Sequence, residues 1–255
     1  MGVVPRELID AMHQRDDVAA LERWLNASPD HTPNDLDADE SPYTLLMITA
    51  EHGAIECAKF LLANGAQVDL CGRDGPETAL HVASKFCNIH GIKLIDLLID
   101  AGADVNARAQ HGVASNYSEW TPLGTFLHTC PFPATFDASA VLGSFLRAGA
   151  DVDAVAGYPG ERLSAEHQLS RILGSVNDSR PSDLLETIAG YRAAGCSWKA
   201  YKRAPHQNVL AVRSLRARGR AVSTPGTSPY VERLTSPDLP SGVAWKILEY
   251  WLAAV

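Results

Sequence analysis

The residues of this chain that could perform chemistry are nine histidines and five cysteines. A zinc site or an activated cysteine needs such residues at short, characteristic spacings, such as C-x-x-C or H-E-x-x-H. Neither spacing occurs, and although His128 and Cys130 are two positions apart, no third residue that would orient the pair is evident. The phosphate-binding G-x-x-x-x-G-K-[ST] and hydrolase G-x-S-x-G patterns are missing as well. The sequence therefore predicts a protein without a catalytic site, a bound metal or a cofactor.

The composition narrows the class of partner. The 255 residues carry a net charge of −8, which disfavours a general nucleic-acid-binding protein. No apolar run approaches the length of a membrane span, and residues 1–17 lack the apolar core of a secretory signal peptide. The cysteines are scattered and odd in number, which is typical of thiols in a reducing compartment. We expect a protein of the cytoplasm or the nucleus that binds neither nucleic acid nor membrane.

Residues 78–106 hold the clearest structural pattern. In their second half, Ile92, Ile95 and Leu98 recur at helical spacing, so one face of this segment is apolar. Gly102 stands where the helix should end, because glycine adopts the left-handed C-cap without steric cost. A helix pair of this size cannot bury its own apolar face, so neighbouring copies must cover it. The pattern therefore predicts an array of helix pairs.

The same stretch resembles the ankyrin repeat. Thr78–Ala83 reads T-A-L-H-V-A, close to the ankyrin signature T-P-L-H-x-A, and Gly102–Asn106 reads G-A-D-V-N, like the family's closing turn. The resemblance implies an all-α ankyrin-repeat solenoid, in which each unit is a β-turn finger followed by two antiparallel helices. It also implies that His81 is structural and hydrogen-bonds the backbone of the adjacent turn.

Imperfect copies of this unit organise most of the chain. Residues 1–40 should form a capping helix pair and an acidic loop, with Asp16 or Asp17 capping the second helix. In the repeat that follows, Met47 stands in the histidine position. The repeat around His81 has three extra residues, which we place in the turn between its two helices. Ankyrin repeats are expected within residues 41–198, at 41–73, 74–107, 117–154 and, in degenerate form, 160–198.

The degenerate copy and the tail are predicted from weaker patterns. In the degenerate copy, Ser182 or Asp183 should cap the second helix and Gly195 should end it. Residues 199–255 should form a basic segment, a linker and a C-terminal helix, with a short amphipathic helix at 209–219. The basic segment has no Asp or Glu, and we interpret it as a solvated helix face or an intramolecular partner of the acidic repeats.

The C-terminal residues resemble two short modules that recruit cullin ubiquitin ligases through adaptor proteins. A Leu-Pro pair before an apolar helix is similar to the start of an F-box and to the end of a SOCS box. The resemblance implies a cullin-ligase adaptor as a partner. The alternative is a helix that caps the last repeat. The residues that carry the resemblance are Leu239, Pro240, Ile247, Leu248 and Tyr250.

The function predicted from the family resemblance is a non-catalytic protein-interaction scaffold. Its partner, of unidentified type, should bind the concave side made by the first helices and the finger tips. One alternative is a substrate receptor of a cullin ligase, whose tail recruits the ligase, and another is an enzyme with an unrecognised site in residues 155–255. The predicted partner-binding residues combine charged and aromatic side chains: Arg73, Asp74, Glu77, Arg108, His111, Tyr117, Glu119 and Trp120.

Overall fold

The structure of the chain is a computed structural model, and its described part is helical. The chain divides into two compact units, residues 1–188 and 189–255. The predicted all-α class is confirmed. No helix in the described part of the chain is long and apolar enough to cross a membrane. The described residues are 4–36, 43–72, 77–90, 92–109, 120–129, 136–154, 163–173, 180–219, 234–236, 238–240 and 243–244.

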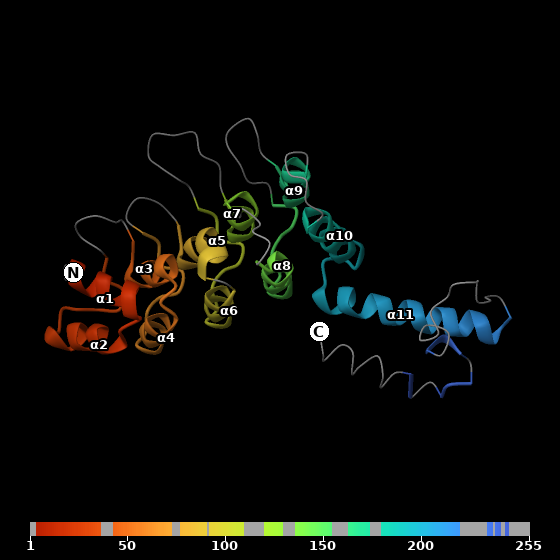
Figure 1. The fold of residues 1–255 in the computed structure, drawn as a ribbon, viewed down its shortest axis with the longest axis horizontal. Coiled ribbons are helices and arrows are strands. Elements are labelled where there is room, and N and C mark those ends of the chain that lie inside the picture. Colours follow the sequence, from red (N-terminus) through yellow and green to blue (C-terminus); the bar gives the residue numbers. More distant parts are fainter. Residues whose placement is uncertain are drawn as a thin grey trace. The chain divides into compact units, whose positions relative to one another are not determined.

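The first unit stacks helix pairs in two rows (Figure 1). The first helix of each pair packs against the first helix of the next, and the second helices pack likewise. The row of first helices contains α1 (Arg6–Arg15), α3 (Leu45–His52), α5 (Ala79–His90), α7 (Pro122–Thr129) and α9 (Ala165–Leu173). The row of second helices contains α2 (Val18–Ala27), α4 (Ile55–Ala63), α6 (Lys93–Asp100) and α8 (Ala138–Arg147).

Short polar side chains begin several of these helices, as local chemistry predicts. Asp17 accepts a hydrogen bond from the Ala20 amide (3.0 Å), so the predicted cap of the second helix is Asp17. The Thr44 hydroxyl accepts from the Met47 amide (3.2 Å) and starts α3. At the other end, Gly102 has a φ of 91°, a left-handed conformation that a side chain would strain. The starts of α2 and α3 and the end of the helix before Gly102 are therefore set by residues within one turn of the boundary.

Closing turns of successive repeats are joined by a hydrogen-bond ladder. In each turn, an Asn or Asp side chain accepts a hydrogen bond from a backbone amide of the following turn. This side-chain ladder links four successive turns, so the repeats are held in register at the surface as well as in the core. The pairs are Gln67 N to Asn34 (2.8 Å), Asp104 N to Asp69 (3.0 Å) and Asp151 N to Asn106 (2.8 Å).

The extra residues of the third helix pair lengthen a helix. We expected them in the turn between the two helices, and this expectation was wrong. Helix α5 has 12 residues, whereas α3 and α7 have 8 each. No Gly or Pro interrupts the sequence between Thr78 and Gly91, so the helix continues until the glycine.

The degenerate copy forms two helices, α9 and α10 (Arg180–Ala193). The predicted caps of the second helix were wrong, since α10 begins at Arg180 and places Ser182 and Asp183 inside its first turn. Pro181 is tolerated there because the first turn needs no amide donor at that position. Gly195 has a φ of 70°, as expected of a residue that ends a helix.

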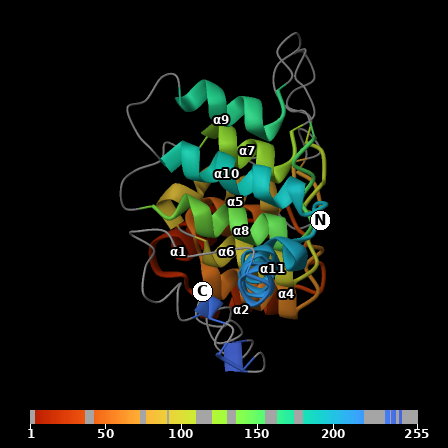
Figure 2. The ribbon, with the colours of Figure 1, turned by 90° about the vertical axis from the view of Figure 1, so that its right-hand side faces the viewer.

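In the second unit, the basic segment forms one helix, α11 (Trp198–Ala217), which is longer than the predicted 209–219. Arg213 is 7% exposed and donates hydrogen bonds to the carbonyls of Leu234 (3.0 Å) and Leu239. Arg216 donates to the Thr235 hydroxyl at 2.5 Å. Figure 2 views α11 along its axis. Two cations of the basic segment therefore bind Leu234, Thr235 and Leu239.

Candidate interaction surface

His81 fastens the base of a finger to helix α5. Its side chain is fully buried, and its Nδ1 accepts hydrogen bonds from the Thr78 amide (3.3 Å) and hydroxyl (2.9 Å). Because Nδ1 accepts, Nε2 carries the proton and donates to the Trp120 carbonyl at 3.0 Å. The predicted structural role of His81 is confirmed.

Three fingers leave the first unit from closed bases. The first is closed by a bridge between Leu36 and Thr44, and the second by a hydrogen bond from the Gly72 amide to the Glu77 carbonyl (3.2 Å). At the third, Ala109 and Trp120 exchange two backbone hydrogen bonds of 2.8 and 3.0 Å. Each finger therefore starts and ends at residues fixed to the helix stack.

The predicted partner-binding residues lie at these bases or outside the described part of the chain. Arg108 is exposed, but Glu77 is 8% and Trp120 is 6% exposed. The Trp120 ring packs on the His128 ring, with centroids 4.6 Å apart, so it belongs to the packed base and does not offer a free contact face. The remaining five, which the structure does not describe, are Arg73, Asp74, His111, Tyr117 and Glu119.

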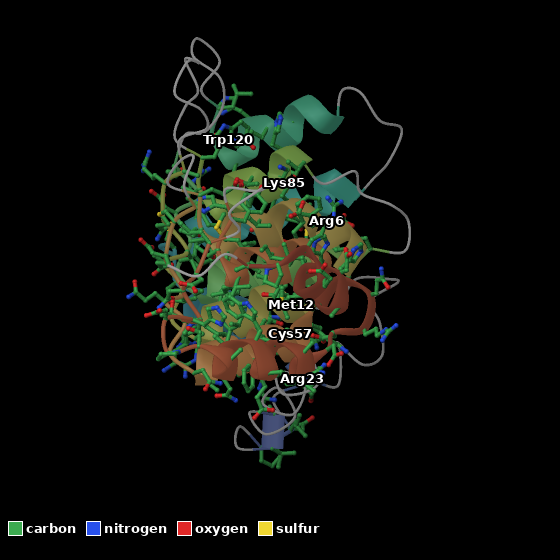
Figure 3. All side chains as sticks on the ribbon, turned by 90° about the vertical axis from the view of Figure 1, so that its left-hand side faces the viewer. Arg6, Met12, Arg23, Cys57, Lys85 and Trp120 are labelled. Carbon is green, nitrogen blue, oxygen red and sulfur yellow. The ribbon has the colours of Figure 1, made fainter. Side chains whose placement is uncertain are left out.

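A different set of residues forms the surface at the ends of the first helices. In three repeats, all seven residues from the leading threonine onward are buried: 44–50, 78–84 and 121–127. The eighth residue of each repeat reaches the surface, and it is Glu51, Lys85 or His128. Lys85 is labelled in Figure 3. We call these three residues the first-helix row. Aligning the three copies on their threonines would have revealed this row. The eighth residue differs in charge between the copies, whereas the seven residues before it are mostly apolar or small.

Glu51 of the first-helix row interacts electrostatically with charged groups on neighbouring elements. Burial raises the pKa of the Glu51 carboxyl, Glu77 raises it further, and Lys85 and His13 act in the opposite direction. Burial, followed by Glu77, also raises the pKa of Tyr43, whose hydroxyl donates to the Glu77 carboxylate at 3.5 Å. Side chains from α1, α3, α5 and a finger base therefore form one polar patch.

This patch gives the stability of the protein a pH dependence. Glu51 has a folded-state pKa above its unfolded value of about 4.3, so the protonated carboxyl favours the folded state. That contribution is complete below about pH 4 and is lost as the pH rises through the folded pKa. We expect Glu51→Gln to be more stable than the native chain at about pH 7 and equally stable at about pH 3. Urea unfolding followed by circular dichroism at both pH values measures this. Glu22→Gln, at an exposed position of α2, serves as the control. The prediction would be contradicted if the stability difference between Glu51→Gln and the native chain were the same at both pH values.

The remaining chemical groups in the described part of the chain do not point to catalysis. Burial, together with the nearby Asp16 carboxylate, raises the pKa of the Cys57 thiol, which keeps it protonated and poorly nucleophilic. Burial also raises the pKa of Cys71. Within the described ranges, no group of three or more His, Cys, Asp or Glu side chains could hold a metal ion. The polar patch around Glu51 can bind a polar surface of another molecule.

The predicted ligase-recruiting tail is only partly within the described residues. Leu239 is half-buried and held through its carbonyl by Arg213, and Pro240 is exposed. Ile247, Leu248 and Tyr250 lie outside the described residues. Recruitment of a cullin-ligase adaptor by this segment stays a prediction.

Two rows of packed helices with fingers at their starts define a helical solenoid, in which each unit is covered by the next. Residues 8–109 match the family model for ankyrin repeats, in three copies. These residues therefore form ankyrin repeats. Helices α7 and α8 continue both rows beyond the matched residues. No curated protein matched the chain.

Proposed function

We propose that this chain is a non-catalytic scaffold that binds a protein partner on the side formed by the ends of the first helices and the fingers. Ankyrin repeats are general protein-interaction modules. The observation that carries the proposal is the first-helix row, in which a half-buried carboxylate, an exposed ammonium and an exposed imidazole occupy equivalent positions on a packed base. Side chains that differ from repeat to repeat on a uniform scaffold provide specificity without catalytic machinery.

The next position along each helix extends this surface. His52, Phe86 and Thr129 are half-buried and border the row. The Lys85 ammonium lies 5.5 Å from the centroid of the Phe86 ring, so this pair offers charge and apolar area together. We also propose that the finger residues Arg73, Asp74, His111, Tyr117 and Glu119 contact the partner. The protein is proposed to reside in a reducing compartment, the cytoplasm or the nucleus.

The test compares two lysines of one repeat. Lys85 in the middle of α5 and Lys93 at the start of α6 are both exposed, but only Lys85 is in the first-helix row. We expect Lys85→Glu to lose the proteins that co-purify with the full native chain, by at least about tenfold in quantitative mass spectrometry, because a reversed charge meets the partner's surface. Lys93→Glu makes the same chemical change on the other row and should retain them. Equal retention by both variants would contradict the proposed surface.

A further inference from the structure

Equivalent residues of two repeats differ in whether they can ionise. The residue three positions after the leading threonine is Met47 in the repeat before the second finger and His81 in the repeat before the third. Both side chains are fully buried. His81 donates to the Trp120 carbonyl (3.0 Å), which also accepts from the Ala109 amide (2.8 Å) and so closes the third finger. The base of the third finger is therefore bonded to an ionisable side chain, whereas the methionine at the equivalent position cannot ionise.

The surroundings of His81 favour its neutral form. Its Nδ1 accepts hydrogen bonds from the amide and the hydroxyl of Thr78, so a proton on Nδ1 would leave the amide without its acceptor. His81 also lies in the first turn of α5, where the helix dipole disfavours a positive charge. A fully buried charge is costly unless it is paired. The closed base therefore excludes the proton that an imidazole in water takes up below about pH 6.5.

Other ionisable groups lie near this site. His128 of α7 matters most, because its ring packs on the Trp120 ring and an exposed imidazole takes up a proton in the same pH range. A variant without the His81 imidazole separates the contribution of these groups from that of His81. The others are Glu51 and His52 on α3, Lys93, Asp96 and Asp100 on α6, Lys85 on α5 itself, and Tyr43 and Glu77 beside the second finger.

We propose that His81 makes the third finger sensitive to pH: below about pH 6.5, uptake of a proton by its imidazole opens the base of this finger, while the second finger stays closed. This rests on the proposed function, because the third finger belongs to the proposed binding side and Arg108 and Trp120 lie at its base. Opening would displace these residues, so binding of the partner weakens as the pH falls.

The size and the sign of the effect follow from linkage. In the opened base His81 is in water and binds one proton, which the closed base excludes. The equilibrium constant for opening therefore rises about tenfold for each pH unit below about 6.5, and it is constant well above that pH. Between about pH 7.5 and about pH 5.5 the expected rise is about tenfold in all.

Amide hydrogen exchange of the full chain measures this opening without a partner. We expect exchange of the Ala109 and Trp120 amides, corrected for the intrinsic rate at each pH, to be about tenfold faster at about pH 5.5 than at about pH 7.5. The Gly72 amide, which donates to the Glu77 carbonyl at the base of the second finger, is the internal control. Its corrected rate should change by less than about twofold.

Two variants identify the group that takes up the proton. His81→Met should remove the pH dependence of the third finger, and methionine is suited to the site because Met47 is fully buried at the equivalent position. His128→Gln should keep the pH dependence, because the imidazole of His81 is still present. Nitrogen-15 NMR of the native chain adds a measurement that needs no variant, and it should show Nδ1 of His81 without a proton in the closed protein at about pH 5.5.

Four results would overturn the proposal. The first is equal corrected exchange of the Ala109 and Trp120 amides at both pH values, and the second is an unchanged pH dependence in His81→Met. The third is loss of the pH dependence in His128→Gln, which would make His128 the sensor. The fourth is a protonated His81 ring at about pH 5.5 while the base stays protected from exchange. Failure of the Lys85→Glu experiment would leave these results unaffected, since exchange is measured on the chain alone.

Discussion

His81→Ala is expected to lower the free energy of unfolding of the repeat array by about 3 kcal/mol. The imidazole is fully buried, so its removal leaves a cavity beside α5. It also takes a hydrogen-bond partner from Thr78 and from the Trp120 carbonyl, which closes the next finger. Both losses fall at one junction between two repeats, and each unit in such an array depends on its neighbours.

Urea unfolding of the full chain, followed by circular dichroism, measures this loss. His81→Met separates its two causes, because methionine fills much of the volume without the hydrogen bonds and should cost about half as much. Methionine already occupies the equivalent position in the preceding repeat, where Met47 is fully buried. The control is Lys93→Ala, at an exposed position of α6, with an expected change of under about 0.5 kcal/mol. A loss for His81→Ala no larger than that for Lys93→Ala would show that the buried imidazole contributes little.

Features that depend on neighbouring residues could be predicted from the sequence. The role of His81 follows from a T-x-L-H pattern four residues long, and the end of the second helix follows from Gly102. The cap by Asp17 is equally local, since the carboxylate reaches an amide three residues ahead. In each case the interaction that the pattern predicts lies within one helical turn, so residue type and spacing determine it. The second partner of His81, the Trp120 carbonyl, is 39 residues away and does not follow from the pattern.

Features that depend on distant contacts could not be predicted in the same way. Trp120 is a residue type that is common at binding surfaces. Only its packing on His128 and its bridge to Ala109 show that it belongs to the base of the third finger. The basic segment likewise shows no local sign that Arg213 donates to carbonyls more than 20 residues later. The first-helix row is an intermediate case. Its exposure could be predicted from the register of the repeats, but the partner that it binds could not.

The contact that links the first two helix pairs is of the distant kind, and removing it should have a large effect. Asp16 ends α1 in a left-handed conformation, with a φ of 49°, and its carboxylate accepts hydrogen bonds from the amides of Glu56 (2.7 Å) and Cys57 (2.8 Å). These amides belong to the start of α4, whose own N-cap residue, Ala54, provides no side-chain cap. Asp16 therefore caps a helix of the next repeat, 40 residues away.

Asp16→Ala is expected to destabilise the junction of the first two pairs by about 2 kcal/mol, through two lost charge-assisted hydrogen bonds and strain in a left-handed alanine. Asp16→Asn keeps an acceptor and tolerates this conformation, so it should cost less than half as much. Asp17→Ala is the matched control, because Asp17 caps its own helix and its loss should weaken α2 alone, by about 1 kcal/mol.

Hydrogen exchange of the full chain distinguishes a cap between repeats from a cap within one. If Asp16 joins the two pairs, Asp16→Ala should speed exchange in α1, α2 and the first turn of α4 together, while α5 to α8 keep their protection. Asp17→Ala should speed exchange mainly in α2. Faster exchange confined to the last turn of α1 in Asp16→Ala would mean that the carboxylate only orders its own turn. The terminal pair would then be held to the array by its apolar faces and by the ladder bond of Asn34, with Met12 and Leu21, both fully buried, as the main apolar contributors.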